Sequence, residues 1–515
     1  MGLSYNDLIL LRFIQKRERT LLSTVAFQFG KNEISIRRAI EQINLYSESP
    51  LIEVKKSHCI CRLSYSDYVE FARHISMDDY ASSWLERIRV MIVAIFFHGY
   101  VNASALYEQW GFSLTTKKQD TAHLRQFLKD YKLTLKTLKT KGLSITGDEL
   151  MFRFLVIDIL HPLLEFTAEN RIEARFANTP LENQTYALAE PYLLPVSRQA
   201  AEQLEDFLTR HSLSINYPSK KFLLLFFCIM IIRPVTQDMI FSPNLPLSPM
   251  NLSFSDSPPA NWFCNVAVSM MNFSRSLDFP VDHRLWYTTE DFAEQVITSL
   301  PDPFSVHDDL ILELYNYFYR EITLAHFHCT FVDKTVENTR GQFPALYQTI
   351  EKYAVLFKAA YNFDFAEEHT STLTLLIQKH VLRNQTVSGG HKKVVVVTSI
   401  NFERVSFFLE QIRDKVNLKW TGTLNINEIH RLNAMDYDYI FCFSTRIYNL
   451  LHKKNFPVIK INFFVTPEDV ESLLNLGFTT LKHRFHTTSF VLELAGKSQE
   501  EMIRYLTTQY SDYFV

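Results

Sequence analysis

The stretch KGLSITGDELMFRFL, residues 141–155, determines how the N-terminal part of this chain is interpreted. Gly142 and Gly147 are separated by four residues, which is the glycine spacing of a phosphate-binding loop. Such a loop continues with Lys and then Ser or Thr, whereas Asp148 and Glu149 follow here, and two carboxylates would repel a phosphate. The stretch therefore predicts no nucleotide site. It predicts a strand, a turn at the second glycine, and a helix capped by Asp148.

The composition indicates a globular protein with several domains and much helix. A chain of 515 residues is too long for one hydrophobic core and should hold roughly three to five domains. With 47% hydrophobic and 14% aromatic residues, the chain is far from the composition of a disordered protein. Only 12 glycines are present, which favours helix. We therefore predict a multidomain, mainly α fold.

Charge is unevenly distributed along the chain. Residues 1–150 contain 21 Lys or Arg against 16 Asp or Glu, whereas the remaining residues contain 32 against 40. A balance of +5 at one end and -8 over the remainder predicts that the N-terminal part binds a polyanion.

Cysteine usage and hydropathy indicate a cytoplasmic protein without a membrane partner. The six cysteines form no CxxC pair and have no metal-ligand spacing, and no signal peptide precedes them, so we expect reduced thiols. The longest apolar run, residues 222–232, is about half the length of a membrane span. We expect it to form a buried core helix.

Residues 1–65 have the pattern of a winged helix-turn-helix unit. Two short helices join at Gly30, and the second has an inner face of isoleucines at helical spacing, namely Ile36, Ile40 and Ile43. Its open face carries arginines, which pair with guanine or hold phosphates, and a basic hairpin follows as a wing. The residues expected to contact DNA are Ser35, Arg37, Arg38, Lys55 and Lys56. The alternative is that the two arginines only form a solvated helix face.

Residues 66–150 predict a linker helix and a second winged unit. A helix, a turn at Gly111 and another helix are followed by a hairpin whose last strand is the opening stretch. We expect Thr121, Leu124 and Leu128 to face inward. The residues expected to face DNA are Lys117, Lys118, Gln119, Arg125, Lys139 and Lys141. Two basic winged units in tandem are much harder to obtain by chance than one.

The remainder of the chain predicts two helical domains, 151–275 and 276–388, and an α/β domain, 389–515. Pro195–Pro234 and Ile350–Asn384 each give a helix, a connector and a second helix, which suggests a weak internal duplication. Between them, residues 242–259 hold five of the 18 prolines and predict a loop. The strand-like segments KKVVVVTS, YDYIFCFST and PVIKINFF then alternate with helical ones, as in a small domain with a parallel sheet.

This order of parts resembles the Mga/AtxA-type transcription regulators of Gram-positive bacteria. Its most specific marker is KGLSITGDELMFRFL, which is similar to the sequence that closes their second DNA-binding unit and enters the first regulation domain. The resemblance covers nearly the whole chain. It implies two winged helix-turn-helix units, two phosphotransferase-system regulation domains, and a C-terminal domain similar to enzyme IIB. It also implies control of virulence or carbohydrate genes, and a homodimer formed partly through the C-terminal domain.

The resemblance further implies that phosphocarrier proteins of the sugar phosphotransferase system phosphorylate histidines in the regulation domains. His380, in the segment TLLIQKHVL, matches the phosphorylated position best, whereas the corresponding stretch of the first domain, FLLLFFCIM, has no histidine. The family's other histidine would fall near Glu313, whose permanent negative charge would mimic a phosphate. The remaining candidates are His211, His326 and His328. For each histidine the alternative is a hydrogen-bonded structural role.

No catalysis, metal or cofactor is expected. His326, His328 and Cys329 look like metal ligands, but two histidines and one thiol without a second cluster do not predict a metal site. A working enzyme IIB of this type carries a cysteine in a glycine-containing loop after its first strand. The corresponding loop here, TSINFER at residues 398–404, has neither, so a phosphocysteine relay lacks its nucleophile.

The main hypothesis is a DNA-binding transcription regulator whose partner is double-stranded DNA, controlled by histidine phosphorylation and dimerisation. One alternative is an RNA-binding antiterminator, which shares the regulation domains but would begin with a small β-rich domain. Another is a protein-interaction scaffold whose winged units no longer bind DNA. Salt-dependent binding to duplex DNA separates the scaffold from the main hypothesis.

Overall fold

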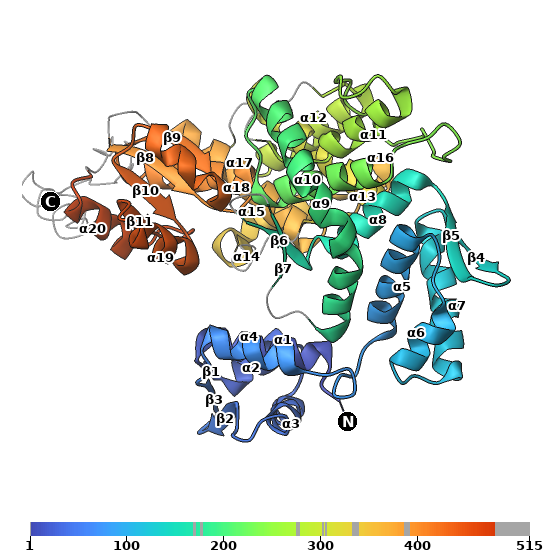
Figure 1. Ribbon diagram of the computed structural model, residues 1–515. Helices are drawn as coiled ribbons and strands as arrows, with labels where there is room; N and C mark the ends of the chain where they lie inside the picture. The colour runs from blue at the N-terminus through green and yellow to red at the C-terminus, as the bar shows by residue number, and fades with distance from the viewer. Residues whose placement is uncertain are drawn as a thin grey trace, which may run out of the picture.

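The computed structural model describes residues 2–167, 171–175, 179–273, 279–300, 303, 306–331, 339–385 and 392–478. The predicted boundaries at residues 275–276 and 388–389 and the final residues 479–515 lie outside these ranges. Figure 1 shows the two N-terminal units, a large helical middle and a C-terminal α/β part. The expectation of a multidomain, mainly α protein with a C-terminal parallel sheet is confirmed.

The first unit is a helix-turn-helix followed by a small sheet. Ile36, Ile40 and Ile43 are all buried, so the periodicity of the sequence identified the inner face of α3 correctly. A third strand, β1, was not expected, and the strand order is β1-β3-β2. The elements are α1 (Tyr5–Arg17), β1 (Arg19–Leu21), α2 (Leu22–Gln28), α3 (Glu33–Asn44), β2 (Ile52–Lys55), β3 (His58–Cys61) and the linker helix α4 (Tyr65–His74).

The second unit repeats this plan with a longer wing. Its two-stranded hairpin contacts the start of α6 closely, because Gly142 lies against the backbone of Val101 and Leu143 forms a bridge with that residue. Gly142 has φ +118°, and a Cβ atom there would collide with the Val101 carbonyl oxygen. The elements are α5 (Trp84–His98), α6 (Ala103–Gln109), α7 (Leu114–Asp130), β4 (Leu133–Leu138) and β5 (Gly142–Gly147).

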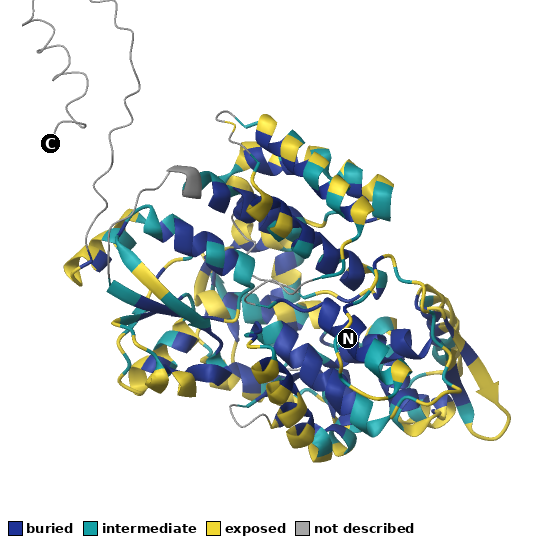
Figure 2. Ribbon diagram, turned by 90° about the horizontal axis from the view of Figure 1, so that it is seen from above, coloured by how far each residue is buried: buried dark blue, intermediate teal, exposed yellow. Residues whose placement is uncertain are grey.

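The helical middle is built around α10, which is almost fully buried along its apolar run, as expected. Figure 2 shows the burial of the central helices beside the exposed wing of the second unit. The helix before α10 begins at Pro180 and includes Pro195, so it is longer than predicted, and a short hairpin, β6–β7, was not expected. The elements are α8 (Glu149–Leu160), β6 (Leu164–Phe166), β7 (Ile172–Ala174), α9 (Pro180–Arg210), α10 (Tyr217–Ile232) and α11 (Pro258–Ser269).

A second group of helices forms its own hydrophobic core, in which Phe292, Phe318 and Phe357 pack together. The predicted helix, connector and helix are present, although Ala354 divides the first helix into α15 and α16. The elements are α12 (His283–Thr298), α13 (Asp308–His326), α14 (Thr339–Gln342), α15 (Pro344–Tyr353), α16 (Val355–Tyr361) and α17 (Glu367–Gln385).

The C-terminal part is a parallel four-stranded sheet of order β11-β10-β8-β9. The three expected strands are β8, β10 and β11. Strand β9 was not predicted from the sequence. It lies at the sheet edge, all but the last residue of LKWTGTL are partly or fully exposed, and the strand therefore has no buried apolar run that would indicate it. The elements are β8 (Lys392–Val397), α18 (Phe402–Arg413), β9 (Leu418–Leu424), the 3-10 helix η2 (Ile426–Ala434), β10 (Tyr439–Cys442), α19 (Thr445–Lys453), β11 (Val458–Lys460) and α20 (Pro467–Asn475).

Candidate nucleic-acid interface

The two helix-turn-helix units share one geometry at an interval of 81 residues. The turn glycines Gly30 and Gly111 are separated by 81 residues, as are the helix N-cap residues Asn32 and Ser113. Both glycines have positive φ, 58° and 72°, and a Cβ atom on either would have nothing within 4 Å. Each position of α3 therefore has a counterpart 81 residues later in α7, which permits a position-by-position comparison of the two helices.

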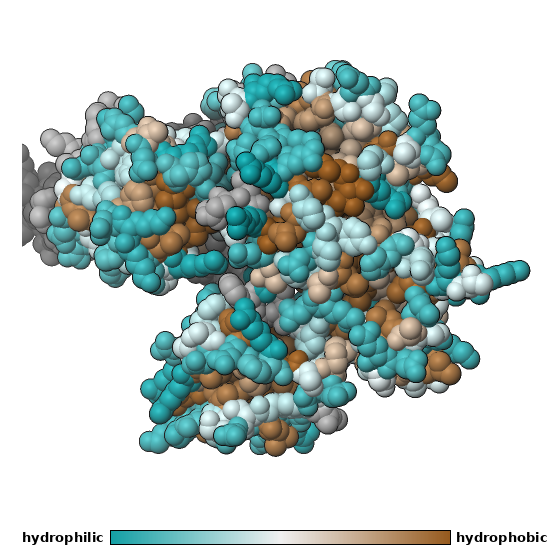
Figure 3. All heavy atoms as spheres, viewed as in Figure 1, coloured by the Kyte–Doolittle hydropathy of each residue, from teal (hydrophilic) through white to brown (hydrophobic). Residues whose placement is uncertain are grey.

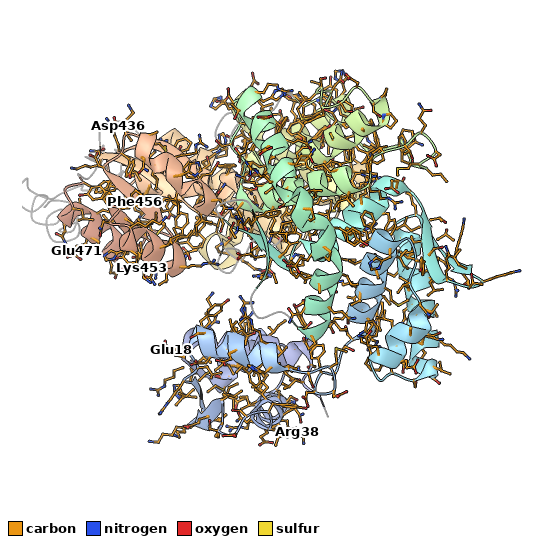
Figure 4. The ribbon with its side chains drawn as sticks, viewed as in Figure 1. Glu18, Arg38, Asp436, Lys453, Phe456 and Glu471 are labelled. Atoms are coloured by element: carbon orange, nitrogen blue, oxygen red, sulfur yellow. The ribbon has the colours of Figure 1, made fainter. Side chains whose placement is uncertain are left out.

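The open face of α3 carries the two arginines that the sequence predicted. Arg37 and Arg38 are both exposed, and Figure 4 shows Arg38 at the outer side of the first unit. Ser35 is half-buried, and its backbone N–H donates to the Asn32 side chain at 2.8 Å, which caps the helix. The first turn of α3 is thus fixed by its own cap, with the arginines one turn further along.

The counterparts of Arg37 and Arg38 in α7 are Lys118 and Gln119, and both are exposed, as is Arg125. Lys117 differs from the expectation. It is the counterpart of the buried Ile36, it is half-buried, and its Nζ donates to Ser104 Oγ at 2.9 Å. This hydrogen bond to a hydroxyl on α6 holds the ammonium group of Lys117 at the inner edge of α7, so Lys117 does not lie on the open face.

Both wings carry exposed lysines near their tips. In the first wing Lys55 pairs with Glu53, and Lys56 has φ +45° in the tight turn between β2 and β3. In the second wing Lys139 and Lys141 are exposed. This wing projects from the body of the molecule, and its tip is hydrophilic (Figures 1 and 3).

A buried ion pair fixes α7 within the second unit, and the sequence reasoning missed it. Asp120 is only 2% exposed although it lies in the helix expected to meet DNA. Arg87 Nε of α5 and the Tyr107 hydroxyl of α6 each donate to Asp120 Oδ2 at 2.6 Å. Three helices therefore meet at one carboxylate. The sequence offered one indication of this pair, because Asp120 occupies the position equivalent to Ala39 of the first unit.

Two exposed apolar side chains on the recognition helices were also missed. Ile34 is 64% exposed in the first turn of α3, and Leu114 is 68% exposed in the first turn of α7. Single exposed apolar side chains are common on protein surfaces, and what distinguishes these two is their place in the first turn of a recognition helix. Apolar groups at the start of a recognition helix suit contact with thymine methyl groups in the major groove.

Comparison with protein families identifies the second unit. Residues 86–159 match the family model described as the Mga helix-turn-helix domain, which corresponds to the segment from α5 into α8. The second unit is an Mga-type helix-turn-helix domain. This domain makes the chain a DNA-binding transcription regulator, and the family is one of DNA-binding proteins rather than of enzymes. No curated protein matches the chain significantly.

The end of the matched segment is the junction with the helical middle. Asp148 caps α8 by accepting from Met151 N at 3.0 Å, as predicted, and its other oxygen accepts from Ser242 N at 2.8 Å. Glu149 accepts two hydrogen bonds from Arg233, at 2.7 and 2.9 Å. Arg153, fully buried, donates to Glu149 at 2.8 Å. The DNA-binding unit is therefore joined to the segment after α10 by a charged network.

His380 lies near the end of α17 and is 6% exposed. Its Nε2 is 3.0 Å from the carboxylate of Glu313 on α13, and Lys379 donates to the same carboxylate oxygen. The sequence singled out His380 and Glu313 separately. The structure brings them into contact.

The other three candidate histidines lie elsewhere. His211 is half-buried at the C-cap of α9, with its ring 5.1 Å from that of Phe207. His328 is exposed, its Nε2 lies 3.2 Å from the Asp130 carbonyl oxygen, and its ring packs on Tyr131. Burial and the nearby charge of Lys132 lower the pKa of His326. His326 and His328 therefore lie beside the end of α7.

The TSINFER loop, residues 398–404, is packed against the helical middle. Glu403 accepts from Arg320 at 2.8 Å and from Asn272 at 2.7 and 2.8 Å. The Arg404 side chain is fully buried, and its Nη2 donates to Thr372 at 3.3 Å. Residues 398–404 therefore form a contact between the α/β domain and the helical middle.

Two further observations concern the described part of the chain. Within it, no group of three or more His, Cys, Asp or Glu side chains has an arrangement that would hold a metal ion. None of its helices has the length and apolar character that crossing a membrane requires.

Proposed function

We propose that both winged units bind the same DNA duplex, with α3 and α7 in the major groove and the two wings along the phosphate backbone. The observation that carries this proposal is the equivalence of the two units. Exposed Arg37 and Arg38 of α3 correspond position for position to exposed Lys118 and Gln119 of α7. Arg pairs bidentately with guanine and Gln with adenine, whereas Lys also neutralises phosphates.

The roles of the residues divide into two kinds. Arg37, Arg38 and Gln119 supply base contacts, because they lie on the open faces of the recognition helices. Lysines of the wings supply phosphate contacts, which position the protein without reading sequence. The phosphate-contacting set comprises Lys55, Lys56, Lys118, Lys139 and Lys141, with Arg125 further along α7.

We further propose that phosphorylation of His380 by a phosphocarrier protein of the sugar phosphotransferase system controls this DNA binding. A phosphoryl group on the ring would place added negative charge beside the Glu313 carboxylate, which now lies 3.0 Å from Nε2. Two anions cannot share that position, so the contact between α13 and α17 must rearrange. Lys379, which donates to Glu313, supplies an ammonium group that would stabilise the phosphate.

We also propose that the protein acts as a homodimer that associates through the C-terminal α/β domain. Winged units on two protomers read two half-sites, and the dimer geometry sets their separation. Virulence or carbohydrate genes are the proposed targets. A change at the contact between α13 and α17 would then alter transcription by changing the relative placement of the protomers.

The experiment that tests DNA binding compares the genomic DNA occupied by the wild type with that occupied by two double variants. The DNA occupied by the wild type is mapped across the genome, and binding to one recovered fragment is measured over a range of salt concentrations. Arg37→Ala/Arg38→Ala and Lys118→Ala/Gln119→Ala should each lose occupancy at these sites. Unchanged occupancy in both double variants would overturn the assignment of α3 and α7.

The same binding measurement distinguishes the alternatives. A protein-interaction scaffold would show no affinity for duplex DNA that falls with rising salt. An antiterminator would prefer a single-stranded or hairpin RNA to the duplex. The N-terminal units contain helices and short wings rather than a β-rich domain, which favours the duplex.

A further inference from the structure

A cavity of about 620 Å³ lies between the helical middle and the C-terminal α/β domain. One wall is formed by the end of α9, the connector after it and the start of α10, and the opposite wall is η2. Its volume falls within the range of about 300–1,000 Å³ that small-molecule sites occupy. None of the DNA-contacting residues or candidate histidines lines it.

The charges that line this cavity compensate one another. Lys220, only 4% exposed, donates to Glu205 at 2.7 Å. On the opposite wall, Arg431 donates to Glu428 at 3.2 Å. Each wall therefore presents one cation and one carboxylate. A dianion entering the cavity would meet both carboxylates, and a cation would meet both basic groups, so neither charge is favoured.

The remaining lining supplies uncharged hydrogen-bonding groups and an apolar surface. Asn427 is only 9% exposed, it lines the cavity, and its Nδ2 has no hydrogen-bond partner among the residues that the structure describes. Ser212 and Ser214 contribute hydroxyls, whereas Leu208 and Leu213 contribute buried apolar side chains. The Nδ2 atom is itself inaccessible to solvent in the cavity, so the hydrogen bonds to a ligand come from the other polar groups of the lining.

We propose that this cavity binds a neutral polyhydroxylated molecule, of the size of a mono- or disaccharide. Each hydroxyl both donates and accepts, so one ligand can donate to Glu205 or Glu428 while accepting from Lys220 or Arg431. The C–H face of a sugar ring suits the leucine surface. Because the two walls belong to different parts of the fold, the bound ligand favours the arrangement in which they face each other, and binding is coupled to their relative placement.

The test uses the full-length protein and measures binding of glucose, maltose and glucose 6-phosphate by calorimetry and by thermal unfolding. We expect saturable binding of at least one neutral sugar and weaker binding of the phosphorylated one. Glu205→Gln should weaken binding of the neutral sugar about tenfold, since it replaces a charged hydrogen-bond acceptor by a neutral one. The matched control is Glu202→Gln, one turn earlier on α9 and outside the cavity, which should bind as the wild type does.

Three results would overturn the proposal: no saturable binding of either neutral sugar, tighter binding of glucose 6-phosphate, or equal affinity in Glu205→Gln and the wild type. Glu205 has a half-exposed side chain, so the Glu205→Gln variant should fold normally. The site does not rest on the DNA contacts or on His380. A failure of sugar binding therefore leaves the proposed function intact, and loss of DNA binding leaves this site intact.

Discussion

Nε2 of His380 and the carboxylate of Glu313 lie 3.0 Å apart, although 67 residues separate them in the chain. Lys379 donates to the same carboxylate, so one acidic side chain on α13 holds two consecutive residues of α17. Burial alone would raise the pKa of Glu313, but the hydrogen bond with His380 and the charge of Lys379 outweigh it and lower the pKa to about 2.

This contact predicts a pH-dependent contribution to stability. Because the pKa of Glu313 is lowered on folding, its contribution is present above the unfolded value of about 4.3 and is lost as the pH falls toward 2. Glu313→Gln should lower the unfolding free energy by about 1–2 kcal/mol at neutral pH, less than for a fully buried pair because Glu313 is partly exposed.

Thermal unfolding at several pH values checks this prediction. The difference in Tm between wild type and Glu313→Gln should be largest near pH 6 and should shrink below pH 4. Glu294→Gln, an exposed acidic residue on α12, serves as the control and should show little difference at any pH. A constant difference for Glu313→Gln down to pH 2.5 would contradict the role of its charge.

The recognition helices and wings predict two separable effects on DNA affinity. Arg37→Ala/Arg38→Ala should weaken binding to a specific site by about 1–3 kcal/mol for each arginine–base pairing that the variant removes. Lys139→Ala/Lys141→Ala, at the second wing, should weaken binding to all sequences alike and reduce the slope of log affinity against log salt by about 1 per phosphate contact.

Fluorescence anisotropy on a specific and a random duplex measures both effects. Arg198→Ala is the control, because this arginine is exposed on α9 and pairs only with Glu202 among the ion pairs described. If the arginine double variant bound both duplexes more weakly by the same factor, its residues would be phosphate contacts instead of base contacts.

The exposed apolar residues of the recognition helices predict methyl readout. Replacing thymine by uracil in the bound site removes a methyl group, whose burial contributes about 0.8 kcal/mol. Affinity of the wild type should fall about fourfold for each methyl group that the protein touches. Ile34→Ser and Leu114→Ser should each bind more weakly to the thymine site and should become insensitive to the replacement at one position. Equal sensitivity in wild type and both variants would exclude this contact.

The buried carboxylate of the second unit predicts a large loss of stability. Asp120→Ala leaves Arg87 buried without the partner at 2.6 Å, and breaking a buried ion pair costs about 3–5 kcal/mol. Urea unfolding should detect this loss, and DNA binding by α7 should fall with it. Glu108→Gln, at an exposed position of α6, is the control and should be nearly neutral. A change below about 0.5 kcal/mol in Asp120→Ala would show that the pair contributes little.

Replacing Gly142 or Gly111 of the second unit by alanine should reduce stability by different amounts. Gly142→Ala should destabilise by about 3 kcal/mol, because its Cβ would collide with the Val101 backbone and its φ of +118° strains an L-residue. Gly111→Ala should cost only about 1 kcal/mol, since its φ of +72° is the left-handed helical region and the space around it is open. Urea unfolding of both variants measures the contrast, and similar costs would contradict it.

Periodicity and turn residues predicted much of this fold correctly. The isoleucines of α3, the cap at Asp148 and the apolar run of α10 each have a strong local signal, and local signals set helices, caps and core faces. The edge strand β9 and the half-burial of Lys117 have no such signal. The position of β9 depends on its pairing with β8, and the half-burial of Lys117 depends on its hydrogen bond to Ser104. The sequence alone predicts neither contact.

The charged networks were harder to predict for the same reason. Asp120 meets Arg87 across 33 residues, and Glu313 meets His380 across 67. Long-range pairing of this kind is set by how helices pack rather than by spacing along the chain. The sequence indicated His380 and Glu313 as important positions through family resemblance alone, and their contact comes only from the packing of α13 on α17.

The two oxygens of Asp148 join the second DNA-binding unit to the helical middle. One oxygen begins α8 and the other receives Ser242, so the second wing and the helical middle share one fixed point. The first unit connects through the segment after α4, where Leu3 pairs with Tyr80. In the proposed dimer, we therefore expect operators to show a constant distance between the half-sites of the two second units. Variation in spacing should be confined to the outer half-sites bound by the first units.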